Sequence, residues 1–297
     1  MPEGPSIVIA REQAAPLFTG KVVREVSGNS RTIDLQRMRG RKVLALRSWG
    51  KHFLVCFPGF TLRVHFLLFG SYRIDEDKPG ASPRVSLRTA RHALNLYACS
   101  VKYLEGDLDA IYDWRTDVMS EAWDPARARR KLKAMPEALA CDALLDQEVF
   151  AGVGNIIKNE VLFRIRVHPL SRIGALPPRK LGELVREARA YSFQFLEWKR
   201  AFVLRQHWLA HNKGTCGKCG RKLTRAYLGE TDRRTFFCEH DQRLYGTAAQ
   251  PRAAAKTLAG ARRGGRLPAA RAEPPLERRA ERANPRKLKA RRRATLR

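Results

Sequence analysis

The chain has 297 residues, of which 58 are Lys or Arg and 29 are Asp or Glu, so its formal net charge is +29 at pH 7. This length accommodates two or three domains with sizeable cores. A charge so far from zero exceeds what solubility requires and indicates a polyanionic partner, most simply a nucleic acid. Charge alone leaves an anionic membrane surface as the alternative.

The N-terminus and the cysteines argue against a secreted or membrane-spanning chain. Glu3, Arg11 and Glu12 interrupt the first twenty residues, so no secretory signal is visible. The most apolar stretch, residues 53–72, contains a proline and two basic side chains, which favours strands over a membrane span. The six cysteines form no secreted disulfide framework. We therefore expect a protein of the reducing cytoplasm, with no membrane partner.

The first residues, Met1 to Pro5, carry a candidate nucleophile. If Met1 is removed, Pro2 presents a free secondary amine with a pKa of about 8, low enough to be partly neutral at pH 7. Such an amine attacks a sugar aldehyde carbon to give an iminium ion, which serves as an electron sink. Glu3 is placed to carry protons for this chemistry. The alternative is a frayed terminus that happens to contain prolines.

A β-rich region follows a short amphipathic helix predicted over residues 6–20. Residues 21–104 hold short runs of strand type separated by turn residues, which predicts an antiparallel β-sandwich. The individual strands are predicted over residues 42–46, 52–57, 61–66, 71–74 and 93–97. Lys51 lies between a glycine and a predicted strand. Its side chain either reaches a phosphate or an active-site cavity, or is an ordinary solvated loop lysine. Leu67, Leu68 and Phe69 are either core residues or a wedge that fills the gap left by an extruded base.

The apolar period changes to that of helices near residue 113, and helices are predicted over residues 126–135, 143–150, 156–163 and 179–201. Between two of them, Gly152 and Gly154 form a tight turn and Asn155 opens the next helix as its cap. The glycines and the helix N-terminus together favour phosphate binding. An ordinary helical hairpin is the alternative.

Three cysteines cluster in the segment 213–245. Cys216 and Cys219 form a CxxC pair, and eighteen residues separate Cys219 from Cys238. With a fourth ligand from His240 or Asp241, these thiolates suit a tetrahedral structural zinc ion. A segment this short needs such a staple, although three reduced cysteines in a metal-free hairpin remain the alternative. The hairpin is predicted over residues 226–237, with Arg233 and Arg234 near its tip.

Residues 247–297 contain no aromatic residue, 16 Lys or Arg, 3 Glu and 5 Pro. This tail carries a net charge of +13, which leaves +16 for the rest of the chain. We predict that it is disordered and raises non-specific DNA affinity. The chain is accordingly an α+β protein with a sandwich domain over 1–118, a helical domain over 119–212, a zinc-finger domain over 213–246 and the basic tail.

Together these motifs resemble the bacterial formamidopyrimidine-DNA glycosylase and endonuclease VIII family. The opening Pro2-Glu3-Gly4-Pro5 resembles its catalytic N-terminus. Residues 144–163 resemble its helix–two-turn–helix signature, and residues 233–238 resemble its zinc-finger hairpin. The resemblance covers residues 2–245 and implies a bifunctional enzyme of base excision repair that removes oxidised bases and then nicks the strand.

The resemblance also implies residue roles. Pro2 is the nucleophile, Glu3 the acid/base and Lys51 a catalytic contact to the lesion-side phosphate. Asn155 and Arg233, beside Gly152 and Gly154, grip the DNA backbone. The wedge Leu67-Leu68-Phe69 stands where endonuclease VIII has Gln-Leu-Tyr, which favours oxidised pyrimidines as substrates. Asp241 stands where the family has its fourth zinc cysteine. The partner is double-stranded DNA with oxidised bases or abasic sites, no nucleotide cofactor is needed, and we expect a monomer near the bacterial nucleoid.

Two other function classes remain as alternatives. One is a damaged-DNA-binding paralogue that does not cut, against which Pro2, Glu3 and Lys51 argue. The other is an RNA- or ribosome-associated protein with a helix–two-turn–helix and a basic tail, against which the β-rich first hundred residues argue. Retention of Met1 indicates the first class, and preference for RNA over duplex DNA indicates the second.

Overall fold

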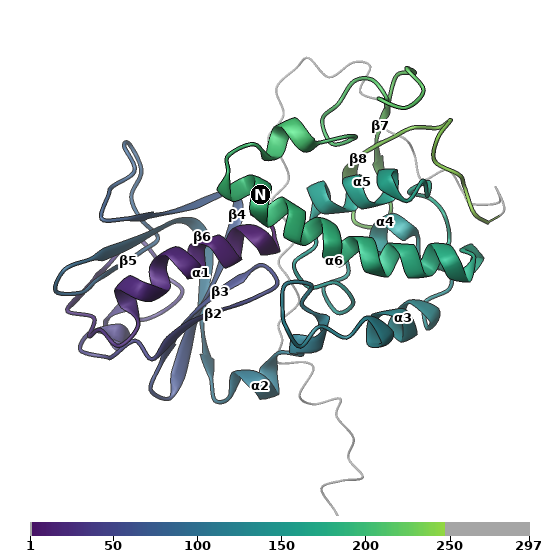
Figure 1. The fold of residues 1–297 in the computed structure, drawn as a ribbon. Coiled ribbons are helices and arrows are strands. Elements are labelled where there is room, and N and C mark those ends of the chain that lie inside the picture. The colour runs from purple at the N-terminus through teal and green to yellow at the C-terminus, as the bar shows by residue number, and fades with distance from the viewer. Residues whose placement is uncertain (1, 247–297) are drawn as a thin grey trace, which may run out of the picture. The chain divides into compact units, whose positions relative to one another are not determined.

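The computed structural model describes residues 2–246 of the chain. A helix, α1 (Gly4–Phe18), precedes a six-stranded antiparallel sheet whose strand order is β1-β5-β6-β4-β3-β2 (Figure 1). The strands are β1 (Glu25–Ser27), β2 (Ala45–Trp49), β3 (His52–Phe57), β4 (Phe60–Ile74), β5 (Val85–Arg88) and β6 (Ala93–Glu105). A short 3₁₀ helix, η1 (Leu35–Met38), lies between β1 and β2. The predicted N-terminal helix and β-rich region are confirmed.

The sheet folds over an apolar core to form the predicted sandwich. Val26 of the edge strand β1 and Val55 of β3, near the other edge, belong to one buried cluster. Ile7, Ala14 and Phe18 of α1 fill the same cluster at helical spacing. The two predicted strands 61–66 and 71–74 are one long strand, β4, because both halves pair with β6 across a register shift between Phe66 and Ser71.

The second half of the chain is helical. Its α-helices are α2 (Leu108–Ile111), α3 (Pro125–Lys133), α4 (Ala140–Ala143), α5 (Asn155–Arg164) and α6 (Pro178–Arg200). The 3₁₀ helices are η2 (Trp114–Thr116), η3 (Ile173–Ala175) and η4 (Leu204–His207). A separate apolar cluster packs α3, α4, α5 and α6 together, with Phe150, Ile157 and Phe195 among its buried members. The predictions for α3, α5 and α6 are confirmed to within two residues at each end.

The predicted helix over residues 143–150 is wrong, since the only helix there, α4, ends at Ala143. Side chains provide the backbone with other partners, as polar side chains near a helix end often do. Asp146 accepts a hydrogen bond from the Glu148 N–H at 2.8 Å. The Gln147 amide bonds the Leu145 carbonyl at 2.7 Å and accepts from the Gly152 N–H at 3.0 Å. The turn before α5 is therefore built by side-chain bonds.

The C-terminal part of the described chain is a hairpin of β7 (Thr224–Leu228) and β8 (Arg233–Phe237), as predicted. A small apolar cluster beneath it contains Phe163, Leu223 and two of the three clustered cysteines. The domain boundaries at residues 118, 212 and 246 stay predictions. The predictions for the tail, residues 247–297, lie outside the described residues.

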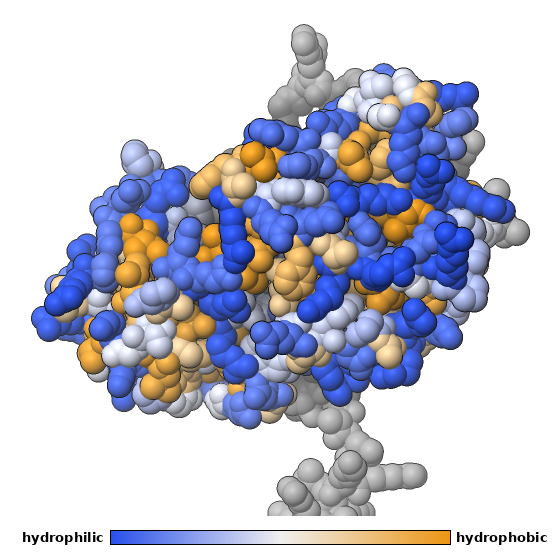
Figure 2. Space-filling model, viewed as in Figure 1, coloured by the Kyte–Doolittle hydropathy of each residue, from blue (hydrophilic) through white to orange (hydrophobic). Residues whose placement is uncertain are grey.

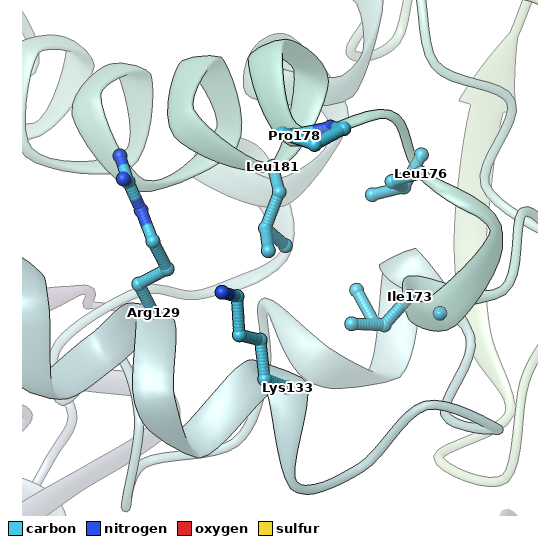
Figure 3. Close-up of a pocket in the computed structure, with 7 residues that line it drawn as sticks. Arg129, Lys133, Ile173, Leu176, Pro178 and Leu181 are labelled. Carbon is cyan, nitrogen blue, oxygen red and sulfur yellow. The ribbon is translucent and has the colours of Figure 1, made fainter.

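The surface has few apolar side chains. Figure 2 shows one face on which hydrophilic residues predominate and apolar ones occur in small groups. Figure 3 shows a hollow of about 320 Å³ between α3 and the start of α6, lined by Arg129, Lys133 and apolar side chains. None of the predicted site residues lines it. Among the described residues, no helix has the length and apolarity needed to cross a membrane.

Candidate active site and metal centre

Glu3 lies at the N-terminus of α5, although more than 150 residues separate the two in sequence. Its side chain is buried, and its carboxylate accepts hydrogen bonds from the N–H groups of Gly154 at 3.2 Å, Ile156 at 2.7 Å and Ile157 at 3.2 Å. These are donors that a helix start leaves without intrahelical partners. The structure thus brings together the predicted catalytic N-terminus and the predicted helix–two-turn–helix motif.

Opposing effects act on the Glu3 carboxyl. Burial raises its pKa above the ordinary value, and this effect is larger than that of the Ile156 N–H and the Lys51 charge, which lower it. Lys51 is therefore close enough to act on Glu3 through its charge. A buried carboxyl with a raised pKa is a better proton donor near neutral pH than an exposed glutamate.

Four glycines form the junction where these segments meet. The Gly4 N–H donates to the Gly152 carbonyl at 2.9 Å. A Cβ on Gly4 would lie 2.9 Å from the Gly152 Cα, and one on Gly50 would lie 3.1 Å from the Gly152 nitrogen. A Cβ on Gly154 would lie 2.4 Å from the Glu3 carboxyl carbon. Gly152 and Gly154 therefore make room for the N-terminal segment, while their predicted DNA contacts stay a prediction.

Asp117 holds the turn that carries Lys51. Its carboxylate accepts from the Gly50 N–H at 2.9 Å and from the Met119 N–H at 2.9 Å. Burial raises the pKa of Asp117 to about 6, against the effect of these two N–H groups. No sequence pattern indicates a role for this residue, because an isolated Asp in a linker is ordinarily solvated.

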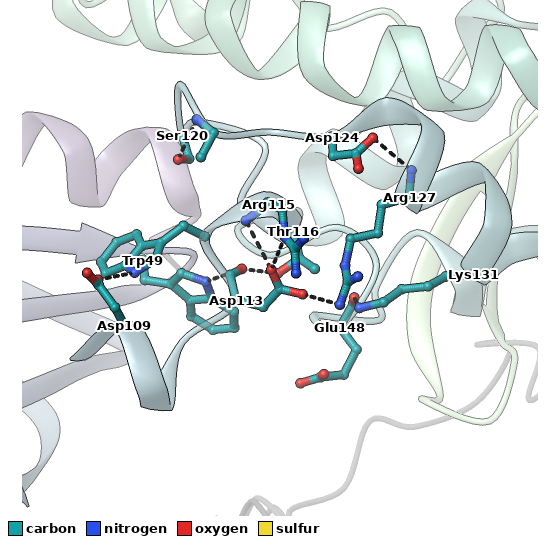
Figure 4. A network of polar contacts seen from close by, with 12 residues as sticks. Trp49, Asp109, Asp113, Arg115, Thr116, Ser120, Asp124, Arg127, Lys131 and Glu148 are labelled. Atoms are coloured by element: carbon teal, nitrogen blue, oxygen red, sulfur yellow. Dashed lines mark hydrogen bonds and ion pairs between the residues drawn. The ribbon is translucent and has the colours of Figure 1, made fainter. Parts of the chain in front are cut away.

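The linker around Asp117 ties the sheet to the helical part. The Trp49 indole donates to the Asp113 carbonyl at 3.1 Å, and the Asp113 carboxylate pairs with Arg127 of α3 at 2.5 Å (Figure 4). The Trp49 ring also packs on Tyr112, with centroids 4.8 Å apart. The Lys51 turn is thus fixed on both sides.

Asn155 is the first residue of α5, and its N-cap is Gly154, so the predicted capping role of Asn155 is wrong. The Glu3 carboxylate takes the place of a local cap. The Asn155 side chain instead donates to the Arg234 carbonyl of β8 at 2.8 Å. Arg233, the first residue of β8, is exposed. The two predicted phosphate contacts therefore lie on elements that touch.

The predicted wedge residues lie at the irregularity in β4. Leu67, Leu68 and Phe69 are 48%, 58% and 79% exposed, and they are among the few large apolar side chains of the described chain with such exposure. The core alternative for these residues is excluded. Their exposure suits a wedge that inserts into a base stack.

The clustered cysteines form a candidate metal centre. One ligand atom from each of Cys216, Cys219, Cys238 and Asp241 lies within 4.8 Å of the others. The Cys219 and Cys238 sulfurs are 3.5 Å apart, and the Cys216 sulfur is 3.0 Å from an Asp241 oxygen, separations that suit a tetrahedral ion. Asp241, and not His240, completes this group of four. These residues fit a metal ion with three thiolates and one carboxylate.

Two family models match the chain. The formamidopyrimidine-DNA glycosylase N-terminal domain matches residues 1–99, and the formamidopyrimidine-DNA glycosylase H2TH domain matches residues 116–192, which together make up more than half of the chain. The chain belongs to the formamidopyrimidine-DNA glycosylase and endonuclease VIII family.

Named relatives agree with this assignment. The chain is 31% identical to "Endonuclease 8-like 3" of Mus musculus, over 70% of this chain and 36% of that protein. It is 27% identical to "DNA-(apurinic or apyrimidinic site) lyase Nei2" of Mycolicibacterium smegmatis, over 80% of this chain and 97% of that protein. The chain spans 36–39% of the length of the first four curated relatives.

Solved structures share the fold. A formamidopyrimidine DNA glycosylase from Lactococcus lactis, bound to DNA with an abasic site, superposes with a TM-score of 0.72 at 18% identity. The match covers 81% of this chain and 99% of that one. At this identity the likeness confirms the predicted sandwich and helical domain.

Proposed function

We propose that the protein is a DNA glycosylase and abasic-site lyase that removes oxidised bases from duplex DNA. The observation that carries the proposal is the buried Glu3 carboxylate, held at the N-terminus of α5 beside Pro2 and within reach of the Lys51 charge. The name of the relative from Mycolicibacterium smegmatis includes lyase activity on abasic sites. The charge of +29 suits a DNA partner.

The chemistry begins once Met1 has been removed. The Pro2 nitrogen forms a bond to C1′ of the damaged nucleotide as the bond from C1′ to the base breaks, and the base leaves with a proton. Glu3 protonates the ring oxygen as the sugar opens, which gives an iminium ion. The iminium makes the C2′ proton acidic, so its loss expels the 3′ phosphate. A second elimination expels the 5′ phosphate and leaves a one-nucleotide gap, and water then hydrolyses the iminium, which releases the unsaturated sugar aldehyde and restores the Pro2 amine.

The other predicted residues bind the substrate in this proposal. Lys51 contacts the phosphate beside the lesion, and Asn155 and Arg233 hold the flanking backbone. Leu67, Leu68 and Phe69 fill the space that the extruded nucleotide leaves, since chemistry on a base requires its removal from the stack. We place the protein with the bacterial nucleoid, because the described part and the tail are both basic.

Borohydride trapping on a duplex with an abasic site tests the reaction. We expect a covalent protein–DNA adduct with the wild type and none with a form that retains Met1. Tight binding without an adduct would instead support the non-cutting paralogue. Stronger binding to an RNA duplex of the same sequence would support the RNA-associated alternative.

We propose that oxidised pyrimidines are the preferred substrates. The bulky apolar triplet Leu67-Leu68-Phe69 resembles the endonuclease VIII wedge in sequence, and its exposure suits that role. Single-turnover rates on matched duplexes with 5-hydroxycytosine or 8-oxoguanine measure the preference. Faster removal of 8-oxoguanine would contradict it.

We propose that the metal centre holds one structural zinc ion, with Cys216, Cys219, Cys238 and Asp241 as ligands. Three thiolates and one carboxylate suit zinc, which when bound would staple the hairpin to the loop that precedes it. Elemental analysis of the purified protein tests this assignment. We expect about one zinc per chain, and a protein without metal would contradict it.

A further inference from the structure

Lys158 of α5 is among the largest fully buried side chains of the described structure, with 0% exposure. Lysine is rarely buried completely without a charged partner. Within residues 2–246, no carboxylate lies within ion-pair distance of its ammonium group. Burial lowers the pKa of Lys158 to about 8, so the group is still largely charged at pH 7. The reaction proposed above does not use it.

Lys158 connects α5 to the strand that begins with Arg233. Its Nζ donates to the Thr235 hydroxyl at 2.7 Å, and that hydroxyl donates to the Arg233 carbonyl at 2.9 Å. Thr235 is also buried, with 1% exposure. The two hydrogen bonds form a continuous chain from the interior of α5 to the backbone of Arg233.

Neighbouring side chains of α5 extend this connection along β8. Asn155 donates to the Arg234 carbonyl at 2.8 Å, and Asn159 accepts from the Phe236 N–H at 3.4 Å. Residues 155, 158 and 159 lie on one face of the helix, since residues three and four apart are neighbours there. Three successive residues of β8 are therefore held by one helix face. We name this set, residues 155, 158, 159 and 234–236, the polar seam.

Charges of both signs act on the Lys158 ammonium group besides burial. Cys141, Asp142 and Glu3 raise the pKa of Lys158, and Arg233, with a smaller effect, lowers it because two positive charges repel. The Asp142 carboxylate already accepts from the N–H groups of Glu230 and Thr231 in the hairpin turn. A phosphate held by Arg233 would bring a negative charge to this region and reduce the repulsion.

We propose that Lys158 is a positioning residue for DNA binding, which fixes Arg233 through Thr235 and adds a buried positive charge behind the phosphate site. This inference rests on the proposed DNA-binding role of Arg233. The partner is a backbone phosphate of duplex DNA. The polar seam also links Arg233 to α5, the helix whose N-terminus holds Glu3. The proposed phosphate-binding residue and the proposed acid/base are therefore both attached to α5.

A double-mutant cycle on binding tests this inference. The dissociation constant is measured at several salt concentrations for a duplex with a tetrahydrofuran abasic analogue. We expect Lys158→Met and Arg233→Ala each to weaken binding about tenfold, and the isosteric Thr235→Val about threefold. Because Lys158 acts through Arg233, adding Lys158→Met to Arg233→Ala should weaken binding by less than about threefold more.

Lys180→Met is the control, since it removes a lysine of α6 whose ammonium group bonds the Ile165 carbonyl and the Glu183 carboxylate, both at 2.7 Å, and no residue of the polar seam. We expect its affinity to equal that of the wild type. Unchanged binding in Lys158→Met and Thr235→Val, with weak binding in Arg233→Ala, would overturn this inference alone. Unchanged binding in Arg233→Ala would overturn the proposed role of Arg233. If Lys158→Met does not fold, the affinity of Thr235→Val for the duplex still tests whether the Lys158–Thr235–Arg233 connection supports DNA binding.

Discussion

The site around Glu3 and the metal centre are assembled in opposite ways. Glu3 is held by three backbone N–H groups that lie more than 150 residues away. The four candidate metal ligands come from 26 consecutive residues, 216–241, and meet through their own side chains. The spacing of metal-binding cysteines is a pattern that can be recognised in a sequence. Backbone N–H groups that hold a distant carboxylate belong to any residue type, so they produce no such pattern. A local centre is therefore visible in sequence, and a site held by backbone becomes visible only in the fold.

The two regions also tolerate change differently. Around Glu3 the backbones are in contact, so one added methyl group disturbs the site. The hairpin has anchors besides the metal ligands, namely the polar seam and the bonds from its turn to Asp142. Substitutions at the first region should affect catalysis most, and substitutions at the second should affect metal affinity most.

Gly154→Ala should have the largest effect. Its Cβ would lie 2.4 Å from the Glu3 carboxyl carbon, which forces the carboxylate away from its donors. We expect the single-turnover rate to fall by about 100-fold and the free energy of unfolding by about 1–3 kcal/mol. Gly214→Ala is the control, because no atom lies within 4 Å of its added Cβ. Equal rates for the two variants would contradict the geometry of the Glu3 site.

Asp117→Asn should change how stability depends on pH. The pKa of Asp117 is raised from 3.8 to about 6, so the folded state binds this proton more tightly than the unfolded state. The stability that protonated Asp117 provides is complete below about pH 4 and lost as pH rises through about 6. Relative to Asp117→Asn, the wild type should lose about 3 kcal/mol over this range. Urea unfolding at several pH values measures this loss, and parallel curves would contradict it.

Asp241→Ala should reduce metal affinity by about 100-fold, because it removes one of four ligands. Asp241→Cys should retain the metal, since a thiolate suits zinc equally well. His240→Ala is the matched control, because His240 lies next in sequence but outside the cluster. Competition with a chromophoric chelator gives the affinities. A loss of metal in His240→Ala and none in Asp241→Ala would reverse the ligand assignment.

Phe69→Ala should have the smallest effect on the fold, because the side chain is 79% exposed. We expect the free energy of unfolding to change by less than about 0.5 kcal/mol. Excision from duplex DNA should slow by about threefold to tenfold, because in the proposed role this side chain helps to fill the gap of the extruded nucleotide. An equal slowing on single-stranded DNA would argue against a wedge, since no base stack is opened there.

Sequence patterns predicted the sandwich, three of the main helices, the hairpin and the clustering of Cys216, Cys219 and Cys238, because each leaves a local period or spacing. The predicted helix over 143–150 was wrong, since Asp146 and Gln147 bond the backbone there. Asparagine is a residue type that often caps helices, so the sequence favoured Asn155 as the cap of α5. The backbone N–H groups at the start of α5 instead bond the Glu3 carboxylate, which comes from the other end of the described chain. Lys158 and Asp117 are polar residues in a basic chain, and only the fold shows that they are buried.

We propose that Pro2 and Glu3 act together as nucleophile and acid/base. Peptide mapping of the borohydride-trapped adduct by mass spectrometry identifies the nucleophile. We expect the DNA remnant on the Pro2 nitrogen of an N-terminal peptide that lacks Met1. A remnant on the Nζ of Lys51 or of any other lysine would contradict it, because the buried Glu3 would then serve no N-terminal nucleophile.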